Sequence, residues 1–427
     1  MRNYKLLCLI GFLFVLGLNN SIMAQQDTTG YVTDQHNLQK DIEPIRDINN
    51  SIPQQDYLLF SMMPQSYSEF KNDLFAKTGI QFGLSYQTLY QKASESLTET
   101  NSAWGGWFIF ELSWVAYNKD KDFQGKFLIS LDDRHILNSG QNQAPGFFRL
   151  ETGSLWSTDP SFLNWNLYPA TILWEQEFGK DRLEISVGQF NALNFLDFFR
   201  FADPRTSFSN SQLSSPIALI PIAPPGLGMS LKWWPIKDSE LYVVGLFNDI
   251  NATAGEVDWS GLFKYGEVFA GIEVGYNVLR SREDFDHIHL TMWYGDKLSS
   301  KSFPTSSGWG FKLHGSKQWK RLVVFGNYAY NTSEGGGFNY TNTQRAINLG
   351  IAYLRLFDAK GELAIAASWA QPIDKDLRNQ VGIETYWKIL FGSDLWITPG
   401  IQFIWDPTYN LNTNFIAIPQ LKARIFF

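Results

Sequence analysis

Carboxylates, guanidinium groups and aromatic rings occur close together in the stretch NFLDFFRFADPRTSF, residues 194–208. A charged guanidinium or carboxylate group forms stronger hydrogen bonds than a neutral partner does, and aromatic rings add flat apolar faces. This mixture suits the binding of a hydroxyl-rich polar solute. The candidate binding residues in the stretch are Asp197, Phe198, Phe199, Arg200, Phe201 and Arg205.

Motifs that commonly build catalytic or metal sites are sparse. The histidines show no zinc-ligand grouping; His287 and His289 share one face of an alternating segment, but a zinc site needs further ligands. There is no G-x-S-x-G motif, and SEGGGFNY (333–340) is interpreted as a flexible loop rather than a nucleotide site. We therefore predict no enzymatic activity, no cofactor and no bound metal.

The N-terminal sequence is typical of an export signal. A basic start precedes an apolar run over residues 6–18 and a small residue follows at Ala24, so we predict a signal peptide over residues 1–24. The apolar run is shorter than the ~20 residues that a membrane-spanning helix needs; the alternative is an anchor helix. The only cysteine, Cys8, lies inside this signal, which excludes disulfides and Cys-ligated metals from the mature protein.

Composition points to one large β architecture. The chain has 427 residues, 16% aromatic residues and a formal net charge of −7, and this acidic balance disfavours a nucleic-acid partner. Residues 25–78 are predicted to be a flexible N-terminal segment with one short amphipathic helix. That helix is expected within 68–79, where Phe70, Leu74 and Phe75 recur at helical intervals before a glycine.

From Gly79 onward the hydrophobic period changes to two. Apolar and polar residues alternate in GIQFGLSYQTLY (79–90), VFAGIEVGYNV (268–278) and GELAIAASWA (361–370). Alternating segments of about ten residues between turns are the pattern of membrane β-barrels. We predict an all-β fold for residues 79–427, a closed antiparallel transmembrane β-barrel of about sixteen strands. The predicted strands start near residues 79, 104, 123, 168, 183, 226, 239, 268, 286, 306, 319, 344, 361, 379, 394 and 414.

The connections between these segments alternate in length. Short polar turns such as NKDKD (118–122) and GSKQ (315–318) alternate with long connections such as 133–167 and 192–225. A barrel with both termini on the periplasmic side has short turns on that side and longer loops outside. The strand pattern and the loop pattern therefore predict the same architecture independently.

The sequence ends in PQLKARIFF (419–427), which alternates apolar and polar residues up to Phe427. An unpaired apolar edge strand promotes aggregation, so we predict that the first strand pairs with this strand and closes the ring. An aromatic residue at this position resembles the terminal signal that outer-membrane barrels present to barrel-assembly machinery. The alternative is a soluble Greek-key protein that ends on a strand.

The two faces of the predicted strands differ in chemistry. One face is apolar, with tryptophans near strand ends that suit the aromatic girdles of a membrane barrel. A solid core does not bury many unpaired charges, whereas a water-filled lumen accommodates them, and a barrel of this size is wide enough for one. The opposite face carries the charged residues Glu111, Glu175, Glu273, Lys312, Glu384, Lys422 and Arg424.

Several motifs resemble the carbohydrate-selective porin family of the OprB type. LWEQEFGKDRLEISVGQFN (173–191) is similar to its fourth and fifth strands, and 208–248, with APPGLGMSLKWW, to the loop and hairpin that follow. VGIETYWKI (381–389) and LWITPGIQFIWDPTYN (395–410) resemble its C-terminal strands. The resemblance covers about 79–427, although the expected Trp/Gly lead before the first strand is absent. It implies passive uptake of sugars across an outer membrane.

The loop at 192–225 is expected to fold inward and narrow the lumen, as a loop does in porin-like barrels. Its aromatic faces would then meet sugar rings, and its charged groups would meet sugar hydroxyls. Glu111 and Glu175 on the inward face are candidate opposing carboxylates, and Arg134, in DDRH at a strand end, is a further candidate. The alternative is that the Phe rings only fix the loop to the barrel wall and the charges pair among themselves.

Together these patterns predict an outer-membrane porin of a Gram-negative bacterium that passes carbohydrates passively and selectively. The expected partners are sugars, outer-membrane lipid and, through the strand that ends at Phe427, the barrel-assembly machinery; no nucleic acid is expected. A general or ion-selective porin is the alternative within transport. A barrel enzyme or an adhesin is the alternative from a different class.

Overall fold

The computed structural model describes residues 65–427 with short gaps. The predicted signal peptide and residues 25–64 lie outside the described residues. The side chains of Gln65, Ser68 and Asn277 are also not described. The gaps are residues 120, 122, 138–141, 180–181, 198, 200, 215–224, 237–238, 253–254, 256, 258, 278–285, 298–305, 333–341, 355, 357–360 and 392–393.

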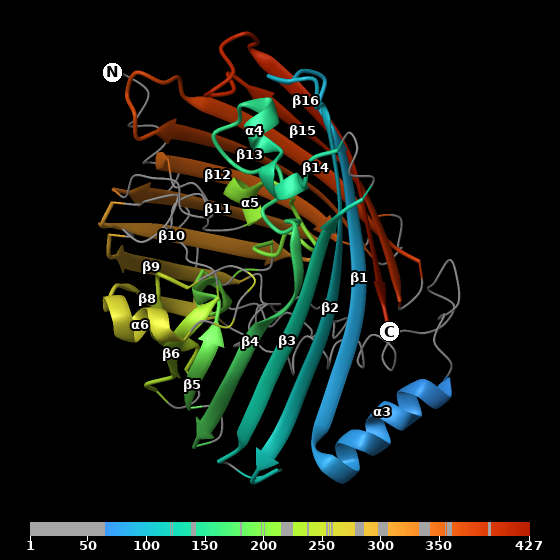
Figure 1. Ribbon diagram of the computed structural model, residues 1–427, viewed down its shortest axis with the longest axis vertical. Helices are drawn as coiled ribbons and strands as arrows, with labels where there is room; N and C mark the ends of the chain where they lie inside the picture. The colour runs from blue at the N-terminus through green and yellow to red at the C-terminus, as the bar shows by residue number, and fades with distance from the viewer. Residues whose placement is uncertain are drawn as a thin grey trace. The chain divides into compact units, whose positions relative to one another are not determined.

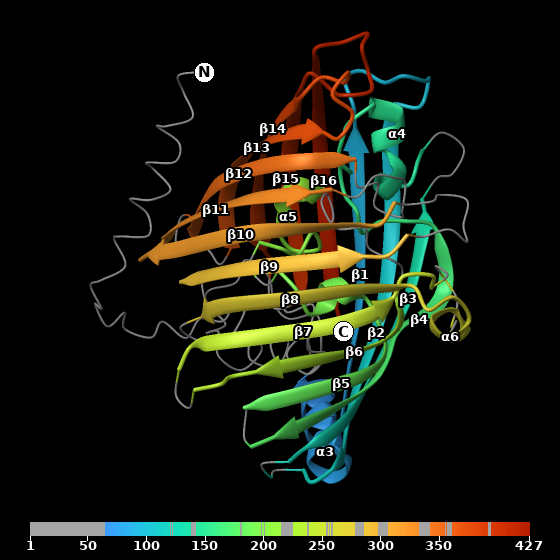
Figure 2. The same ribbon diagram turned by 90° about the vertical axis from the view of Figure 1, so that its left-hand side faces the viewer.

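Sixteen antiparallel strands form a closed barrel (Figure 1, Figure 2). Each strand pairs with its neighbours in the sequence, and β1 also pairs with β16. The fold class predicted from the sequence is therefore confirmed, and every predicted strand start lies within three residues of an observed one. The strands are β1 (Ile80–Lys92), β2 (Ser102–Tyr117), β3 (Gly125–Ile136), β4 (Trp165–Phe178), β5 (Leu183–Phe190), β6 (Gly226–Trp233), β7 (Leu241–Asp249), β8 (Val268–Asn277), β9 (His287–Gly295), β10 (Gly308–Trp319), β11 (Leu322–Asn331), β12 (Thr343–Leu354), β13 (Gly361–Pro372), β14 (Gln380–Leu390), β15 (Leu395–Trp405) and β16 (Phe415–Phe426).

The barrel closes where β1 meets β16. Their register places Tyr86 opposite Ile425, and the backbone N–H of Phe427 donates to the carbonyl of Leu84 at 2.9 Å. The last strand thus has a partner on both sides, and no edge of the sheet is left in the described strands. The predicted pairing of the first and last strands is confirmed.

One helix, α3 (Gln65–Thr78), lies beside this closure. Lys71 Nζ donates to the carbonyl oxygen of Phe427 at 3.4 Å, and the Tyr67 ring meets the Phe82 ring edge-on. The helix ends at Gly79, whose positive φ of 74° is a conformation that glycine adopts readily. None of the helices in the described part of the chain is both long and apolar enough to cross a membrane.

Side chains alternate between the two faces of the barrel wall. On β12, Leu349 and Ile351 are exposed outward, whereas Asn348 and Ala352 are buried on the inner face.

The long connections L2 (137–164) and L3 (191–225) carry short helices that Figures 1 and 2 place near the inside and the long-loop end of the barrel. These helices are η2 (Pro145–Phe147), α4 (Arg149–Thr152), η3 (Ala192–Asn194) and α5 (Ser211–Ser214), and α6 (Ser260–Tyr265) lies in the connection after β7.

We predict that Leu349→Arg destabilises the barrel in lipid by about 2–4 kcal/mol, because it places a charge on the outward face in the middle of β12. Urea titration of the barrel folded in phospholipid vesicles measures the change. Leu349→Ala is the matched control, since it removes the same apolar contacts without adding charge. Equal stability of the two variants would contradict the assignment of this face to lipid.

Candidate functional site

Loop L3 returns into the barrel and contacts the inner face of the wall. All described residues from Phe201 to Ser214 are buried, and α5 lies within the ring of strands in both views (Figure 1, Figure 2). Loop residues normally lie on the surface because their backbone groups need partners. The inner-face side chains of the strands supply those partners here, through three sets of contacts.

The first set of contacts holds Asp197 against β9 and β10. Its carboxylate lies 2.5 Å from Lys312 Nζ and 2.9 Å from His289 Nε2, and its backbone N–H donates to the Glu273 carboxylate. Asp197 adopts a positive φ of 59°, which Asp tolerates better than most residues. Burial alone would raise the pKa of Asp197, but Lys312 and the hydrogen bond from His289 hold it well below its usual range. The carboxylate therefore stays charged at neutral and mildly acidic pH.

Three histidines extend this contact along the wall. Tyr242 donates to Glu273 at 2.7 Å and lies 2.8 Å from His287 Nε2, which lies 3.2 Å from His289 Nδ1. The ring of His314 stacks on His289 with centroids 5.0 Å apart. Asp197, Glu273, Tyr242, His287 and His289 form a closed circuit of hydrogen bonds that ties L3 to the three adjacent strands β7, β8 and β9.

The second set of contacts is aromatic. Phe199 and Phe201 are fully buried against Phe325 of β11, with centroids 5.9 and 4.9 Å away, and Phe208 packs edge-on against Tyr386 of β14 at 4.9 Å. These contacts are the ones expected if the Phe rings fix the loop to the wall. Because these three Phe rings are buried against the wall, they have no exposed face with which to contact a solute.

The third set of contacts uses charged side chains of β14 and β16 to bind the L3 backbone. The Glu384 carboxylate accepts from the N–H groups of Ser209 and Asn210 at 2.7 and 2.8 Å. Lys388 donates to the Thr206 carbonyl at 3.1 Å, and Lys422 donates to the Pro204 and Ser207 carbonyls. The charges on the inner wall therefore have loop backbone groups as partners.

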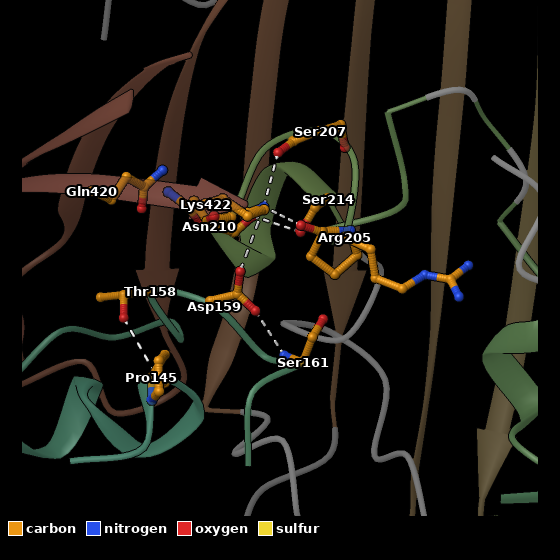
Figure 3. Close-up of polar contacts among 12 residues, drawn as sticks. Pro145, Thr158, Asp159, Ser161, Arg205, Ser207, Asn210, Ser214, Gln420 and Lys422 are labelled. Atoms are coloured by element: carbon orange, nitrogen blue, oxygen red, sulfur yellow. Dashed lines mark hydrogen bonds and ion pairs between the residues drawn. The ribbon is translucent and has the colours of Figure 1, made fainter. Parts of the chain in front are cut away.

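Loop L2 is joined to the same cluster through Asp159. Its carboxylate lies 3.8 Å from Lys422 Nζ and accepts from the Ser161 N–H at 2.9 Å (Figure 3). Ser157 and Ser211 link L2 to L3 directly through two hydrogen bonds of 3.0 and 3.1 Å. Burial raises the pKa of Asp159 to about 6, although the nearby Lys422 opposes this shift. L2 and L3 thus form one packed unit inside the barrel.

On the β2–β4 arc, L3 faces the wall with an arginine. The Arg205 guanidinium points away from the Lys422 cluster in Figure 3 and lies 5.9 Å from the centre of the Trp107 ring. Arg134 of β3 lies over the same ring at 3.9 Å and over Trp165 at 4.8 Å. One indole of the wall is therefore approached by two guanidinium groups, one from the wall and one from the loop.

Each of these two arginines has its own carboxylate. Arg134 Nη2 lies 2.7 Å from Asp132, and Arg205 Nε lies 3.0 Å from Asp203. The charge of each arginine is therefore balanced by a neighbouring aspartate, and both guanidinium groups still lie near the Trp107 ring. The structure brings together two of the residues predicted from the sequence, Arg134 and Arg205, at this ring.

The two predicted opposing carboxylates lie elsewhere on the wall. Glu111 is half-buried on the inward face of β2, opposite Ser130. Glu175 lies near the short-turn end of β4, 2.5 Å from Lys126 Nζ, and its carboxylate converges with those of Glu177 and Glu184. The Lys126 ammonium occupies the place that a cation would take in that acidic group.

The predicted residues separate into two environments. Asp197, Phe199 and Phe201 anchor L3 to the wall, whereas Arg134 and Arg205 face Trp107. Phe198 and Arg200 lie outside the described residues. Sequence reasoning missed Trp107, although it shares the inward face of β2 with Glu111, four residues later. It also missed Asp132, Asp159 and the anchoring histidines, and it treated His287 and His289 only as weak metal ligands.

No family model and no curated protein matches the sequence. The fold is that of a sixteen-stranded porin-type barrel with inward-folded loops. The structure is similar to the high-pH structure of Pseudomonas putida OprB, with a TM-score of 0.68 and 13% sequence identity over 86% of this chain and 99% of that chain. The low-pH structure of the same protein gives a TM-score of 0.52 and 12% identity over 86% and 98%.

The resemblance to the OprB type that the sequence suggested is thus matched in three dimensions. The TM-score of 0.68 shows a shared fold, and at 13% identity the roles of individual residues do not carry over from that protein to this chain.

We predict that the wild-type barrel gains stability relative to Asp159→Asn as the pH falls from 7.5 to 5. A buried carboxyl whose pKa is raised to about 6 stabilises the folded state most below its unfolded pKa of about 4, and the contribution is lost as pH rises through about 6. The expected difference is ~1–1.5 kcal/mol between the ends of this range. Urea unfolding midpoints in detergent or vesicles, measured across the range, report it. Asp376→Asn, which removes an exposed loop carboxylate, is the control. Parallel pH profiles for wild type and Asp159→Asn would contradict the prediction.

Proposed function

We propose that this protein is an outer-membrane porin through which carbohydrates diffuse passively, with L3 and L2 narrowing the barrel. A pore selects solutes by its width, its lining groups and its field. The proposed passage lies between L3 and the arc of wall formed by β2, β3 and β4.

One observation carries this proposal. L3 is tied to β8–β11 through Asp197 and Phe199 and to β14–β16 through Glu384 and Lys422, whereas on the β2–β4 arc Arg205 faces Trp107 across 5.9 Å. A solute that passes along this arc, beside the contact between Arg205 and Trp107, meets an indole and two guanidinium groups. These are the groups that a sugar needs, because its ring has apolar faces and its rim carries hydroxyls.

Charge balance favours neutral solutes over ions. Arg134 is paired with Asp132 and Arg205 with Asp203, so neither sign of charge dominates along the passage. A channel lined by one sign of charge concentrates counter-ions, and a balanced lining does not. This argues against the alternative of a strongly ion-selective porin.

The porin-type fold supports the outer-membrane location and the transport class, and the similarity to Pseudomonas putida OprB is consistent with a sugar as the solute. An apolar outward face, with Trp114, Trp233 and Trp309 among its exposed aromatic residues, suits a bilayer of this kind. Recognition of the β16 strand by barrel-assembly machinery remains part of the proposal. A barrel enzyme or an adhesin has no comparable observation in its favour.

The proposal is tested by single-channel conductance of the purified protein in a planar bilayer, with glucose and maltose titrated in. We expect steady ion current that falls saturably with at least one of the two sugars, because the solute occupies the passage. An ion current that neither sugar reduces would favour a general porin without sugar selectivity. An absence of current would refute the channel.

We predict that Arg134→Gln and Arg205→Gln each weaken sugar block roughly tenfold or more, since each removes a charged hydrogen-bond donor from the passage. The measurement is the sugar concentration for half-maximal block. Arg182→Gln serves as the matched control, because Arg182 is an exposed arginine in the β4–β5 turn that donates only to the Pro235 carbonyl in its described contacts. The passage is wrongly placed if all three variants bind sugar like the wild type.

A further inference from the structure

Loop L2 is held at two places along its length. Ser157 is hydrogen-bonded to L3, and Asp159 lies near Lys422 of the inner wall. Residues 152–155 lie instead against the connection between β15 and β16, which we call L8 (406–414). The second place therefore joins an inward-folded loop to a loop at the long-loop end of the barrel.

Direct hydrogen bonds join L2 to L8. The Tyr409 N–H donates to the Gly153 carbonyl at 2.8 Å, and the Asn410 side chain donates to the Thr152 carbonyl at 3.3 Å. Gly153 ends α4 with a positive φ of 71°, and a Cβ added at this position would lie 2.6 Å from Asn410 Cβ. The glycine thus allows the two loop backbones to lie in direct contact.

Gln380, the first residue of β14, joins both loops to the wall. Its side-chain oxygen accepts from the N–H groups of Leu155 in L2 and Thr408 in L8, at 2.8 and 3.1 Å. Its side-chain nitrogen donates to Ser154 Oγ at 2.9 Å. Gln380 is fully buried. Because a buried N–H group without a partner is costly, this amide favours one relative position of L2, L8 and the wall.

Arg378 holds L8 in the conformation that makes these contacts. It lies in the connection between β13 and β14, and its side chain is 24% exposed. Its guanidinium donates to four oxygen atoms of L8, the carbonyls of Pro407, Asn410 and Thr413 and Oδ1 of Asn414. A guanidinium offers five N–H donors in a fixed planar arrangement, whereas an ammonium offers three. One side chain therefore fixes both halves of L8.

The next part of L2 reaches the proposed passage. Arg134 donates to the Ser161 carbonyl at 2.8 Å, and the Phe162 ring meets the Trp107 ring edge-on with centroids 6.2 Å apart. The position of L2 therefore affects where the arginine and the indole of the passage can lie. The described contacts of Arg378 are with L8, so its geometric influence on the passage is transmitted through L8 and L2.

We propose that L8 holds L2 in its inward position, and that Gln380 and Arg378 are positioning residues for the sugar passage. This proposal rests on the proposed porin function and adds to it two residues that act at a distance from the solute. Without these two side chains, residues 152–155 lose their partners on L8 and the wall, and L2 shifts relative to Arg134 and Trp107. The lumen then becomes wider and its affinity for sugar falls.

The test compares single-channel ion conductance and sugar block in planar bilayers for the wild type, Arg378→Gln and Gln380→Leu, with glucose and maltose titrated in. We expect each variant to raise the ion conductance and to weaken sugar block roughly 3- to 10-fold, because L2 leaves its position beside the passage. If Gln380→Leu fails to fold, Arg378→Gln carries the test, since it changes a partly exposed loop residue.

Two control variants separate the position of L2 from the charge at the mouth of the barrel. Arg378→Lys keeps the positive charge but loses the planar arrangement of donors, so we expect it to weaken block nearly as much as Arg378→Gln does. Arg345→Gln removes an exposed arginine at the same end of the barrel, on the outward face of β12, and is expected to behave like the wild type. Wild-type behaviour of Arg378→Lys would mean that only charge matters, which overturns the role of L8.

A double variant tests the route from L8 to the passage. If Arg378 acts by positioning L2 against Arg134, the effects of Arg378→Gln and Arg134→Gln on sugar block are coupled. We expect the double variant to weaken block less than the product of the two single effects, by roughly twofold or more. Independent effects overturn the proposal.

The remaining outcomes distinguish this proposal from the proposed function. Wild-type conductance and block in both Arg378→Gln and Gln380→Leu overturn the role of L8 and leave the porin intact. Absence of sugar block in the wild type overturns sugar passage instead, and the comparison of ion conductances then decides by itself whether L8 holds L2.

Discussion

Closure of β1 on β16 is the constraint on which the rest of this structure depends. A sheet in lipid has no water to satisfy the backbone groups of a free edge, so every strand must find two neighbours. Residues more than three hundred positions apart in the sequence, such as Tyr86 and Ile425, become neighbours only through that closure. Once the ring is complete, outward side chains form an apolar surface that suits the lipid of the proposed membrane location, and inward side chains form a separate polar compartment.

The polar compartment explains why L3 and L2 can fold inside the barrel. Backbone groups of a loop need partners when they leave water, and charged side chains of the inner wall provide them. Glu384 binds two loop N–H groups, and Lys422 binds two loop carbonyls. The same contacts satisfy the charges, which a solid apolar core would leave unpaired. Loop and wall therefore stabilise each other, because the polar groups of each are the hydrogen-bond partners of the other.

Alternation along single strands was enough to predict the barrel, because it depends only on neighbours within each segment. The same parity correctly assigned Lys312, Glu384 and Lys422 to the inner face. The contact partners of these inner-face charges could not be predicted from the sequence. The Asp197–Lys312 contact, for example, depends on the path of L3 and on the positions of strands more than a hundred residues away. Burial of the Phe rings of L3 against Phe325 could not be predicted for the same reason.

Strand register adds a level of organisation that no single segment contains. Trp107 and Arg134 are paired across a hairpin, which a sequence reader can anticipate from the turn between β2 and β3. Gln87 and Arg424 are paired only because the barrel closes with one particular offset between β1 and β16. A shift of that register by one residue would turn the inward face of a whole strand outward. The pairing that removes the last sheet edge therefore also keeps the inward faces of β1 and β16 side by side.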